Sequence, residues 1–328
     1  MKNGMKTMLI VDGSSMLTTC YYATLPDEVK IAKTDEEKEK SYHLIKKDSD
    51  GKYVNGVDCS LKMISNLLKY QKPDAIAFCF DKSRNTFRRE MYSGYKAQRG
   101  KTPSPLGEQF ITLEKTLDLM GMKTYFSDTY EADDLAASLT EKFKNEADIY
   151  LWSKDADYLQ LVSENVYVWN LCGNKKYKEW MDITYNQDNI NINSFNPKVP
   201  FGIFQFTPEY VKRIEGVRPD QIPDLKGLSG DTSDNIKGVF GVSDSSAIPL
   251  INFYGSVEGI YKVLDEYKGR EDELKKIWKE NFGLKRSPIP YLLSGEADAV
   301  LSKKLATMKR DIPISYNFDD HLVKKERE

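Results

Sequence analysis

The chain has 328 residues, of which 40% are hydrophobic, so it can build one large domain or two modest ones around a normal core. Its 48 basic and 50 acidic side chains give a net charge of −2, which argues against a simple nucleic-acid coat protein. No apolar run reaches the roughly 18 residues of a membrane-spanning helix, and Met1–Thr7 leads into too few apolar residues for a signal peptide. We therefore expect a cytoplasmic protein with no membrane contact.

Cysteine and histidine usage limits the chemistry that the chain can perform. The four cysteines are scattered and form no C-x-x-C pair, and His43 and His321 are the two histidines. This pattern does not fit a zinc site and indicates free thiols in a reducing compartment. It also leaves little room for acid–base catalysis by histidine.

Three short apolar runs predict buried parallel strands in the first half of the chain. Residues 8–11 lead into Asp12, residues 75–80 into Asp81, and residues 149–152 through Ser153 and Lys154 into Asp155 and Asp157. Residues 59–70 and 110–120 have apolar side chains at helical spacing between these runs. The alternation predicts an α/β fold with an open, mostly parallel sheet, whose ligands bind beyond the carboxyl ends of the strands.

Two charged segments separate the first elements. Residues 27–52 carry many charges of both signs and are expected to form a solvated loop or an insertion. Residues 82–101 are basic, with Phe87, Tyr92 and Tyr95 interleaved, and a new helix is expected near Leu106. Basic and aromatic side chains together suit single-stranded nucleic acid, although a solvated amphipathic helix with Phe87 and Tyr95 facing the core would give the same pattern.

The pattern changes near residue 185. Residues 189–206 are rich in Asn and Pro and predict a loop. Helices are then predicted over residues 208–215, 256–267, 272–281 and 296–309. We therefore expect an α/β nuclease core over residues 1–185, with an arch at about 82–105, and a helical DNA-binding part over residues 186–328.

Nine carboxylates stand at predicted strand ends and helix starts, and at one edge of a sheet they would repel each other severely unless cations neutralised them. Oxygen ligands with several waters are what Mg²⁺ and Mn²⁺ prefer. Taken singly, each acid is better explained as a helix cap or a turn residue, and the ordered set carries the inference. The nine are Asp12, Asp81, Glu131, Asp133, Asp134, Asp155, Asp157, Asp231 and Asp234.

The local spacings give more specific expectations. A helix would place Glu131 and Asp134 on one face and turn Asp133 elsewhere. An extended 155–157 segment would project both of its aspartates from the same side. A helix start at 231–234 would again pair two aspartates at i and i+3.

Closely spaced glycines follow in residues 227–242, G-L-S-G-D-T-S-D-N-I-K-G-V-F-G-V. Such glycines let backbone N–H groups approach a phosphate, which binds a duplex without reading its sequence. An ordinary Gly-rich turn is the alternative.

These motifs together resemble the 5′ nuclease family, which includes the N-terminal domain of bacterial DNA polymerase I, bacteriophage flap endonucleases and, more distantly, eukaryotic flap endonucleases. The resemblance covers nearly the whole chain in the family's order. It rests on V-D-G at 11–13, Y-V-N-G-V at 53–57, F-D at 80–81, F-R-R-E-M-Y-S-G-Y-K-A-Q-R at 87–99, Y-E-A-D-D at 130–134, S-K-D-A-D-Y-L-Q-L at 153–161, the glycine motif at 227–242, and L-S-K-K-L-A-T-M-K at 301–309.

The resemblance implies a PIN-like fold with a basic helical arch and a helix–loop–helix motif. It assigns Asp12, Asp81, Glu131, Asp133 and Asp134 to one of two Mg²⁺ ions, for which Mn²⁺ can substitute, and Asp155, Asp157, Asp231 and Asp234 to the second. Tyr95, Lys96 and Arg99 would act at the scissile phosphate, and K⁺ would bind at the helix–loop–helix. The expected DNA-binding residues are Arg84, Arg88, Arg89, Lys101, Lys237, Gly238 and Gly241.

Three departures from the family pattern stand out. Ser243 replaces the last glycine of the motif, and Asp244-Ser245-Ser246 replaces a more basic stretch, so the grip on duplex DNA or on K⁺ would be weaker. Segments 27–52 and 268–286 look like insertions. Because the sequence shows no polymerase region after the nuclease, a stand-alone enzyme is expected.

The resulting hypothesis is a structure-specific 5′ nuclease, acting as 5′-3′ exonuclease and flap endonuclease in DNA replication or repair. Its substrates would be DNA with a 5′ flap or 5′ end, or RNA–DNA hybrids, cut by a two-metal mechanism. The family implies a monomer with possible replication-fork partners. Two alternatives are a single-strand RNA nuclease of the PIN type and a non-catalytic binder of DNA structures.

Overall fold

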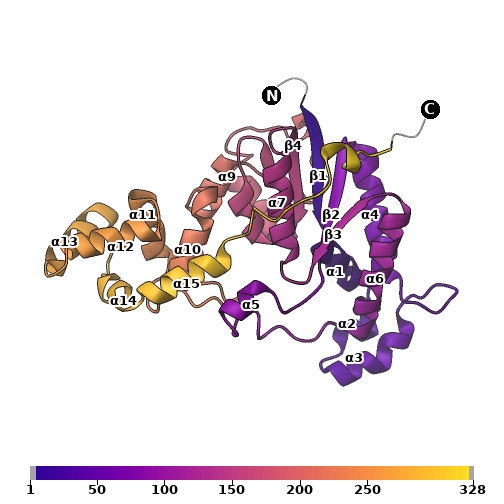
Figure 1. Cartoon of the computed structure of the whole chain (residues 1–328), viewed down its shortest axis with the longest axis horizontal. Coiled ribbons are helices and arrows are strands. Elements are labelled where there is room, and N and C mark those ends of the chain that lie inside the picture. The colour runs from indigo at the N-terminus through magenta and orange to yellow at the C-terminus, as the bar shows by residue number, and fades with distance from the viewer. Residues whose placement is uncertain (1–4, 325–328) are drawn as a thin grey trace.

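A six-stranded sheet forms the centre of the computed structural model, which describes residues 5–324. The strand order is β3-β2-β1-β4-β5-β6, and neighbouring strands pair in parallel except β5 and β6. This confirms the predicted open α/β sheet (Figure 1). The strands are β1 (Lys6–Asp12), β2 (Ala75–Asp81), β3 (Lys123–Ser127), β4 (Ala147–Ser153), β5 (Val166–Leu171) and β6 (Ile203–Phe206).

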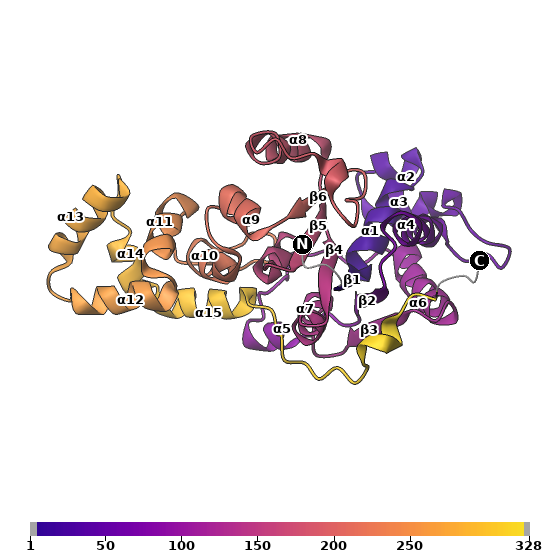
Figure 2. The same ribbon diagram turned by 90° about the horizontal axis from the view of Figure 1, so that it is seen from above.

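Both faces of the sheet are covered by helices, which explains why the strands are continuously apolar. On β1, Met8 and Ile10 point into one buried cluster, whereas Leu9 and Val11 point into the other, as the alternation of side chains along a strand requires. Helices α1 (Gly13–Ala23), α4 (Asn55–Gln71) and α6 (Ser104–Leu119) cover one face, and α7 (Ala132–Phe143) covers the other (Figure 2).

Segment 27–52 is partly helical, which corrects the expectation of a loop. It contains α2 (Asp27–Ile31), α3 (Asp35–Ser41) and the 3₁₀ helix η1 (Tyr42–Leu44). Thr34 begins α3 with a capping box that Glu37 completes, and i,i+3 Lys–Asp pairs lie along both helices. No residue of α3 is buried, so this helix is solvated as expected, whereas Val29 and Ile45 of the same segment are buried.

The arch segment contains less helix than a helical arch would. Between residues 82 and 103 the helix is α5 (Phe87–Met91), and turns follow it. Helix α5 lies beside the end of α15 (Glu296–Ala306), and the chain that follows it runs across toward α6 (Figure 1).

Helices dominate after β6 and extend away from the sheet on one side, as Figure 2 shows. The boundary expected near residue 185 does not coincide with the end of the sheet, because β6 pairs with β5 beyond it. Segment 268–286 contains α13. Before β6 lie α8 (Asn174–Ile183) and η3 (Ile192–Ser194). After β6 and before α15 lie α9 (Pro208–Glu215), η4 (Pro219–Gln221), α10 (Ile222–Ser229), α11 (Asp244–Tyr254), α12 (Val257–Glu266), α13 (Glu271–Phe282) and α14 (Ile289–Ser294).

The chain returns to the sheet after α15. Its last described part runs past α7 and contains η5 (Phe318–His321), and the Val323 amide donates to the Asp74 carbonyl just before β2. Within residues 5–324, no helix has both the length and the apolar character needed to cross a membrane.

Candidate active site

The carboxyl ends of β1, β2 and β4 meet at one edge of the sheet and bring the first acids together. Asp81, at the end of β2, accepts a hydrogen bond from the Ala132 amide at 2.9 Å. This bond joins β2 to the start of α7. It therefore brings the Glu131–Asp134 group to the strand ends, as the sequence predicted.

Asp12 has no cationic partner among the described residues. Its carboxylate caps α1 by accepting a hydrogen bond from the Ser15 amide at 2.8 Å. The same carboxylate accepts a hydrogen bond from the Ser153 hydroxyl, also at 2.8 Å. Burial, followed by the charges of Asp81 and Asp155, raises the pKa of Asp12 from 3.8 to about 7. The carboxylate is thus held close to half-protonated at neutral pH when no cation is near.

The 155–157 segment is not extended throughout, so the condition for projecting both aspartates from one side is not met: Asp155 has extended backbone geometry, but Asp157 lies in a 3₁₀ helix. Asp155 caps the 3₁₀ helix η2 (Ala156–Leu161), and its carboxylate accepts from the Asp157 amide at 2.9 Å. Aspartate side chains commonly bond to the backbone two residues on, and this local bond competes with extended structure. Burial raises the pKa of Asp155, with Lys226 opposing the shift and Asp234 adding to it.

Glu131 and Asp134 lie at the start of α7 and are tied to cations. Arg88 donates to both oxygens of Asp134 at 2.7 and 2.8 Å, and the Lys309 amide donates to the same carboxylate at 2.8 Å. Lys96 lies 2.6 Å from Glu131. Although burial opposes it, the charges of Lys96 and Arg88 lower the pKa of Glu131.

Arg88 occupies the interior instead of the surface expected for a DNA contact. Its side chain is 1% exposed and also donates to the carbonyls of Leu305 and Thr307. We therefore reassign it: Arg88 fixes the arch helix α5 to α7 and to the end of α15.

Three residues of the arch reach the acids directly. The Tyr95 hydroxyl donates to Glu131 and to Asp234, both at 3.1 Å, and the Tyr95 ring is buried. Arg99 lies 2.6 Å from Asp234, and Lys96 lies 3.5 Å from it. The residues that the resemblance places at the scissile phosphate are thus held by the acids in this structure.

Lys226 is a site residue that the sequence interpretation missed. Its ammonium group lies between Asp157 and Asp231, with the Asp231 oxygen at 2.6 Å. Burial acts against it, but Lys226 and the Ser233 donors lower the pKa of Asp231 to about 2. The one available signal was its position in α10, directly before the glycine motif.

The 231–236 segment is a tight turn and not a helix start. Asp231 and Ile236 exchange backbone hydrogen bonds of 2.8 Å, and the Asp231 carboxylate caps the turn by accepting from the Ser233 amide. This geometry still buries Asp234 and directs it to the arch. Asp231 and Asp234 therefore both reach the site, but from a tight turn and not from the first turn of a helix.

The helix–loop–helix is formed by α10 and α11 with the glycine loop between them. Gly238 and Gly241 have φ of +63° and +80°, values that side chains other than glycine rarely adopt. The Gly238 amide donates to the Ser302 hydroxyl at 3.0 Å, whereas Gly241 is exposed beneath the ring of Tyr291. Phe240, at the tip, is 86% exposed.

The remaining expected DNA-binding residues lie on or near the arch. Arg84 is exposed and donates to the carbonyl of Gly100 at 2.6 Å, which closes the base of the arch. Arg89 is half-buried beneath Tyr95, and Lys101 is exposed. Lys237 is exposed and lies over the ring of Tyr92, 5.6 Å from its centroid, so the loop and the arch are neighbours.

The nine acids divide into two sets by their ion pairs within residues 5–324. In the paired set, each carboxylate lies within 2.7 Å of a Lys or Arg nitrogen. In the open set, the closest ion pair is the 3.9 Å contact of Asp133 with Arg88. The paired set is Glu131, Asp134, Asp157, Asp231 and Asp234, and the open set is Asp12, Asp81, Asp133 and Asp155.

No three of these groups in the described part of the chain are arranged as a ready-made cation site. Lys96 and Lys226 stand between acids, where they supply the neutralising charge themselves. The donor set nevertheless fits Mg²⁺ or Mn²⁺, because all of it is carboxylate oxygen and its open part lacks positive charge.

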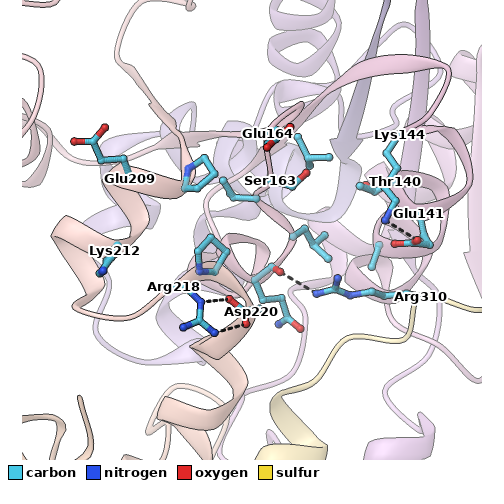
Figure 3. A pocket seen from close by; sticks show the side chains of 17 residues that line it. Thr140, Glu141, Lys144, Ser163, Glu164, Glu209, Lys212, Arg218, Asp220 and Arg310 are labelled. Carbon is cyan, nitrogen blue, oxygen red and sulfur yellow. Dashed lines mark hydrogen bonds and ion pairs between the residues drawn. The ribbon is translucent and has the colours of Figure 1, made fainter. Parts of the chain in front are cut away.

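A separate cavity of about 570 Å³ lies away from the acids, between α7, η2, β5 and α9 (Figure 3). Its charged rim carries both signs, with Arg218 paired to Asp220 and Lys144 to Glu141. None of the nine carboxylates lines it.

An acid-lined strand edge, a basic arch across it and a helix–loop–helix beside it define a nuclease architecture. Two family models match the chain: "5′-3′ exonuclease, N-terminal resolvase-like domain" over residues 7–191 and "5′-3′ exonuclease, C-terminal SAM fold" over residues 217–328. The chain therefore belongs to the 5′-3′ exonuclease family.

Curated relatives agree with this assignment. The chain is 31% identical to a 5′-3′ exonuclease of Aquifex aeolicus over 322 residues, covering 98% of this chain and 88% of that protein. It is 31% identical to DNA polymerase I of Streptococcus pneumoniae over 316 residues, or 96% of this chain. It spans only 30% of that polymerase's length.

Solved structures confirm the fold. Bacteriophage T5 5′-exonuclease with bound zinc superposes with a TM-score of 0.59 at 19% identity, covering 93% of this chain and 90% of that chain. A T5 flap endonuclease in a pseudo-enzyme–product complex with DNA and metal ions superposes with a TM-score of 0.57 at 19% identity, covering 92% and 89%.

Proposed function

We propose that this chain is a structure-specific 5′ nuclease that hydrolyses phosphodiester bonds in DNA with a 5′ flap or 5′ end, using two divalent cations. The convergence of nine carboxylates with the arch cations at one sheet edge supports this proposal most directly. The T5 flap endonuclease whose structure contains DNA and metal ions supports the choice of substrate.

The open set would hold a cation first, because no Lys or Arg nitrogen within residues 5–324 lies closer than 3.9 Å to it and because burial and the charge of Asp81 disfavour the ionised form of Asp12. Binding further ions among the paired acids requires the cationic side chains to leave their carboxylates: Lys96 and Lys226, together with Arg99 at Asp234 and Arg88 at Asp134. When bound, the cations supply positive charge at the attacked phosphate and lower the pKa of water. We assign Asp12, Asp81, Glu131, Asp133 and Asp134 to one ion and Asp155, Asp157, Asp231 and Asp234 to the other.

The chain's own groups bind and orient the strand to be cut. Once released from Glu131 and Asp234, Lys96 and Arg99 would bind the scissile phosphate from the arch side. Tyr95, which is buried, would support these two side chains. The exposed side chains Arg84, Lys101 and Lys237 would follow neighbouring phosphates.

The glycine loop of the helix–loop–helix would bind the duplex. Within residues 5–324 the amides of Phe240 and Gly241 donate to no protein acceptor, so they are free to meet a phosphate. A K⁺ ion at this loop, and a role in replication or repair, belong to the same proposal.

The test is cleavage of a 5′-labelled flap in Mg²⁺ and in EDTA, beside a blunt duplex and a single strand. Mg²⁺-dependent release of short 5′ fragments near the branch point is the expected result. Tight flap binding without cleavage in Mg²⁺ or Mn²⁺ would instead identify a non-catalytic binder. Preferred cleavage of single-stranded RNA would identify the RNA nuclease alternative.

A further inference from the structure

Tyr158 has a buried hydroxyl group with no hydrogen-bond partner. The residue is 1% exposed, and its O–H finds no acceptor in the protein. A buried donor without an acceptor is destabilising, because it has lost its bonds to water. Phenylalanine would fill the same space without this cost, so the hydroxyl calls for an explanation.

The surroundings of this hydroxyl point to the acidic site. Tyr158 follows Asp157 in η2, and η2 packs against α7, whose first turn carries Asp133. Its ring lies in the buried cluster with Ile10, Cys79 and Ala132, the residues that precede or adjoin the acids on β1, β2 and α7. Among described residues the other two unpartnered groups, Ser60 and Trp152, belong to the opposite side of the sheet.

The neutral phenol is a hydrogen-bond donor. The acids of the open set on β1 and β2 have oxygens bound elsewhere: Asp12 accepts from Ser15 and Ser153, and Asp81 accepts from Ala132. The O–H group therefore lies in the buried cluster that the strands carrying these acids also line, and it has no acceptor in the protein.

We propose that Tyr158 is a positioning residue whose O–H group donates to a water molecule in the hydration shell of a divalent cation held by the open set. The inference rests on the proposed function, because it presumes that a cation binds there. Mg²⁺ keeps several of its waters in protein sites, and groups that bind a cation's outer shell commonly change its affinity by about 10–100-fold. The buried hydroxyl cannot touch DNA, so water is the acceptor that fits.

The test uses Tyr158→Phe with Tyr185→Phe as its matched control. Tyr185 is also 1% exposed, but its hydroxyl donates to the Gln205 carbonyl at 2.7 Å. In EDTA, Tyr158→Phe should melt at the wild-type temperature or above it, whereas Tyr185→Phe should melt lower because it loses a buried hydrogen bond. In DNA-free titrations with Mg²⁺ and with Mn²⁺, Tyr158→Phe should raise the dissociation constant about tenfold, and Tyr185→Phe should leave it unchanged.

Two outcomes would overturn the inference alone. One is unchanged metal affinity in Tyr158→Phe while the wild type binds the metal and cuts flaps. The other is a loss of melting temperature in EDTA equal to that of the control, which would mean that the phenol has a partner inside the protein. A wild-type chain that neither binds Mg²⁺ or Mn²⁺ nor cuts flaps would overturn the proposed function as well.

Discussion

The open and paired carboxylates share one sheet edge but are neutralised in different ways. In the paired set the protein supplies the cations, and the pKa values of Glu131 and Asp231 are lowered. Three of the four open acids are dominated by burial, which raises the pKa values of Asp12, Asp133 and Asp155, whereas Asp81 is exposed. The same chemical group is thus stabilised as an anion on one side and destabilised on the other.

This difference shows that basic side chains of the arch and of α10 neutralise the paired acids from within the protein. Lys96 and Arg99 come from the arch and Lys226 from α10, and each could exchange its carboxylate for a phosphate when a metal ion takes over the acid. The open set has no such substitute. It is therefore the part of the site where an added cation should have its largest effect on stability.

The largest expected effect is loss of cleavage in Asp12→Asn and in Asp231→Asn. Each change removes one proposed metal ligand from a different set, and loss of several kcal/mol of charge stabilisation lowers the rate about 10³-fold or more. Flap binding in Ca²⁺ should persist. Rates from single-turnover cleavage of a labelled flap provide the measurement, and wild-type turnover in either variant would remove that residue from the metal site.

Arg88→Leu tests the paired set at Asp134, and it also removes the 3.9 Å contact of Arg88 with Asp133 of the open set. Removing one partner of a buried ion pair leaves Asp134 charged and buried, which costs about 3–5 kcal/mol of unfolding free energy. Urea denaturation measures this loss. Arg89→Leu is the control, since Arg89 is half-buried and makes no ion pair with the acids among the described residues. An equal loss of unfolding free energy in Arg89→Leu would show that the ion pair of Arg88 with Asp134 is not the cause.

The open set also predicts an unusual pH dependence for the metal-free protein. The pKa of Asp12 is about 7 in the folded state and near 3.8 when unfolded, so the folded state binds more protons in between. Stability should therefore fall as pH rises from about 4 to about 7, by up to about 4 kcal/mol. Urea unfolding in EDTA at several pH values measures the slope.

Asp12→Asn is the control for this prediction and should flatten the slope. Saturating Mg²⁺ should flatten it in the wild type, because a bound cation favours the ionised carboxylate. A slope that Asp12→Asn leaves unchanged would show that Asp12 is not its source.

Much of this architecture could be predicted because its signals are local. β1, β2 and β4 follow from continuous apolar runs, and α9 matches its predicted bounds, Pro208–Glu215, because Thr207 and Gly216 cap it. The pairing of Arg88 with Asp134 joins residues 46 positions apart, and no local pattern contains it. Lys226 was missed in part for the same reason, since its partner Asp157 lies 69 positions away, although its other partner, Asp231, follows in the glycine motif.

The smallest expected effect comes from Lys237→Ala. Lys237 is exposed beside the glycine loop, where it lies over Tyr92 and pairs with none of the nine acids. As a phosphate contact it should weaken duplex binding about equally for all sequences and reduce the slope of log affinity against log salt by about one. Cleavage at saturating flap should change less than twofold by this reasoning, because the contact is equally strong before and during reaction.

Fluorescence anisotropy across a salt series measures the slope. The control is Lys62→Ala, which changes an exposed lysine on α4. If Lys237→Ala had the same salt slope as the wild type, Lys237 would not contact a phosphate. The proposal that the duplex binds at the glycine loop would then lose its support.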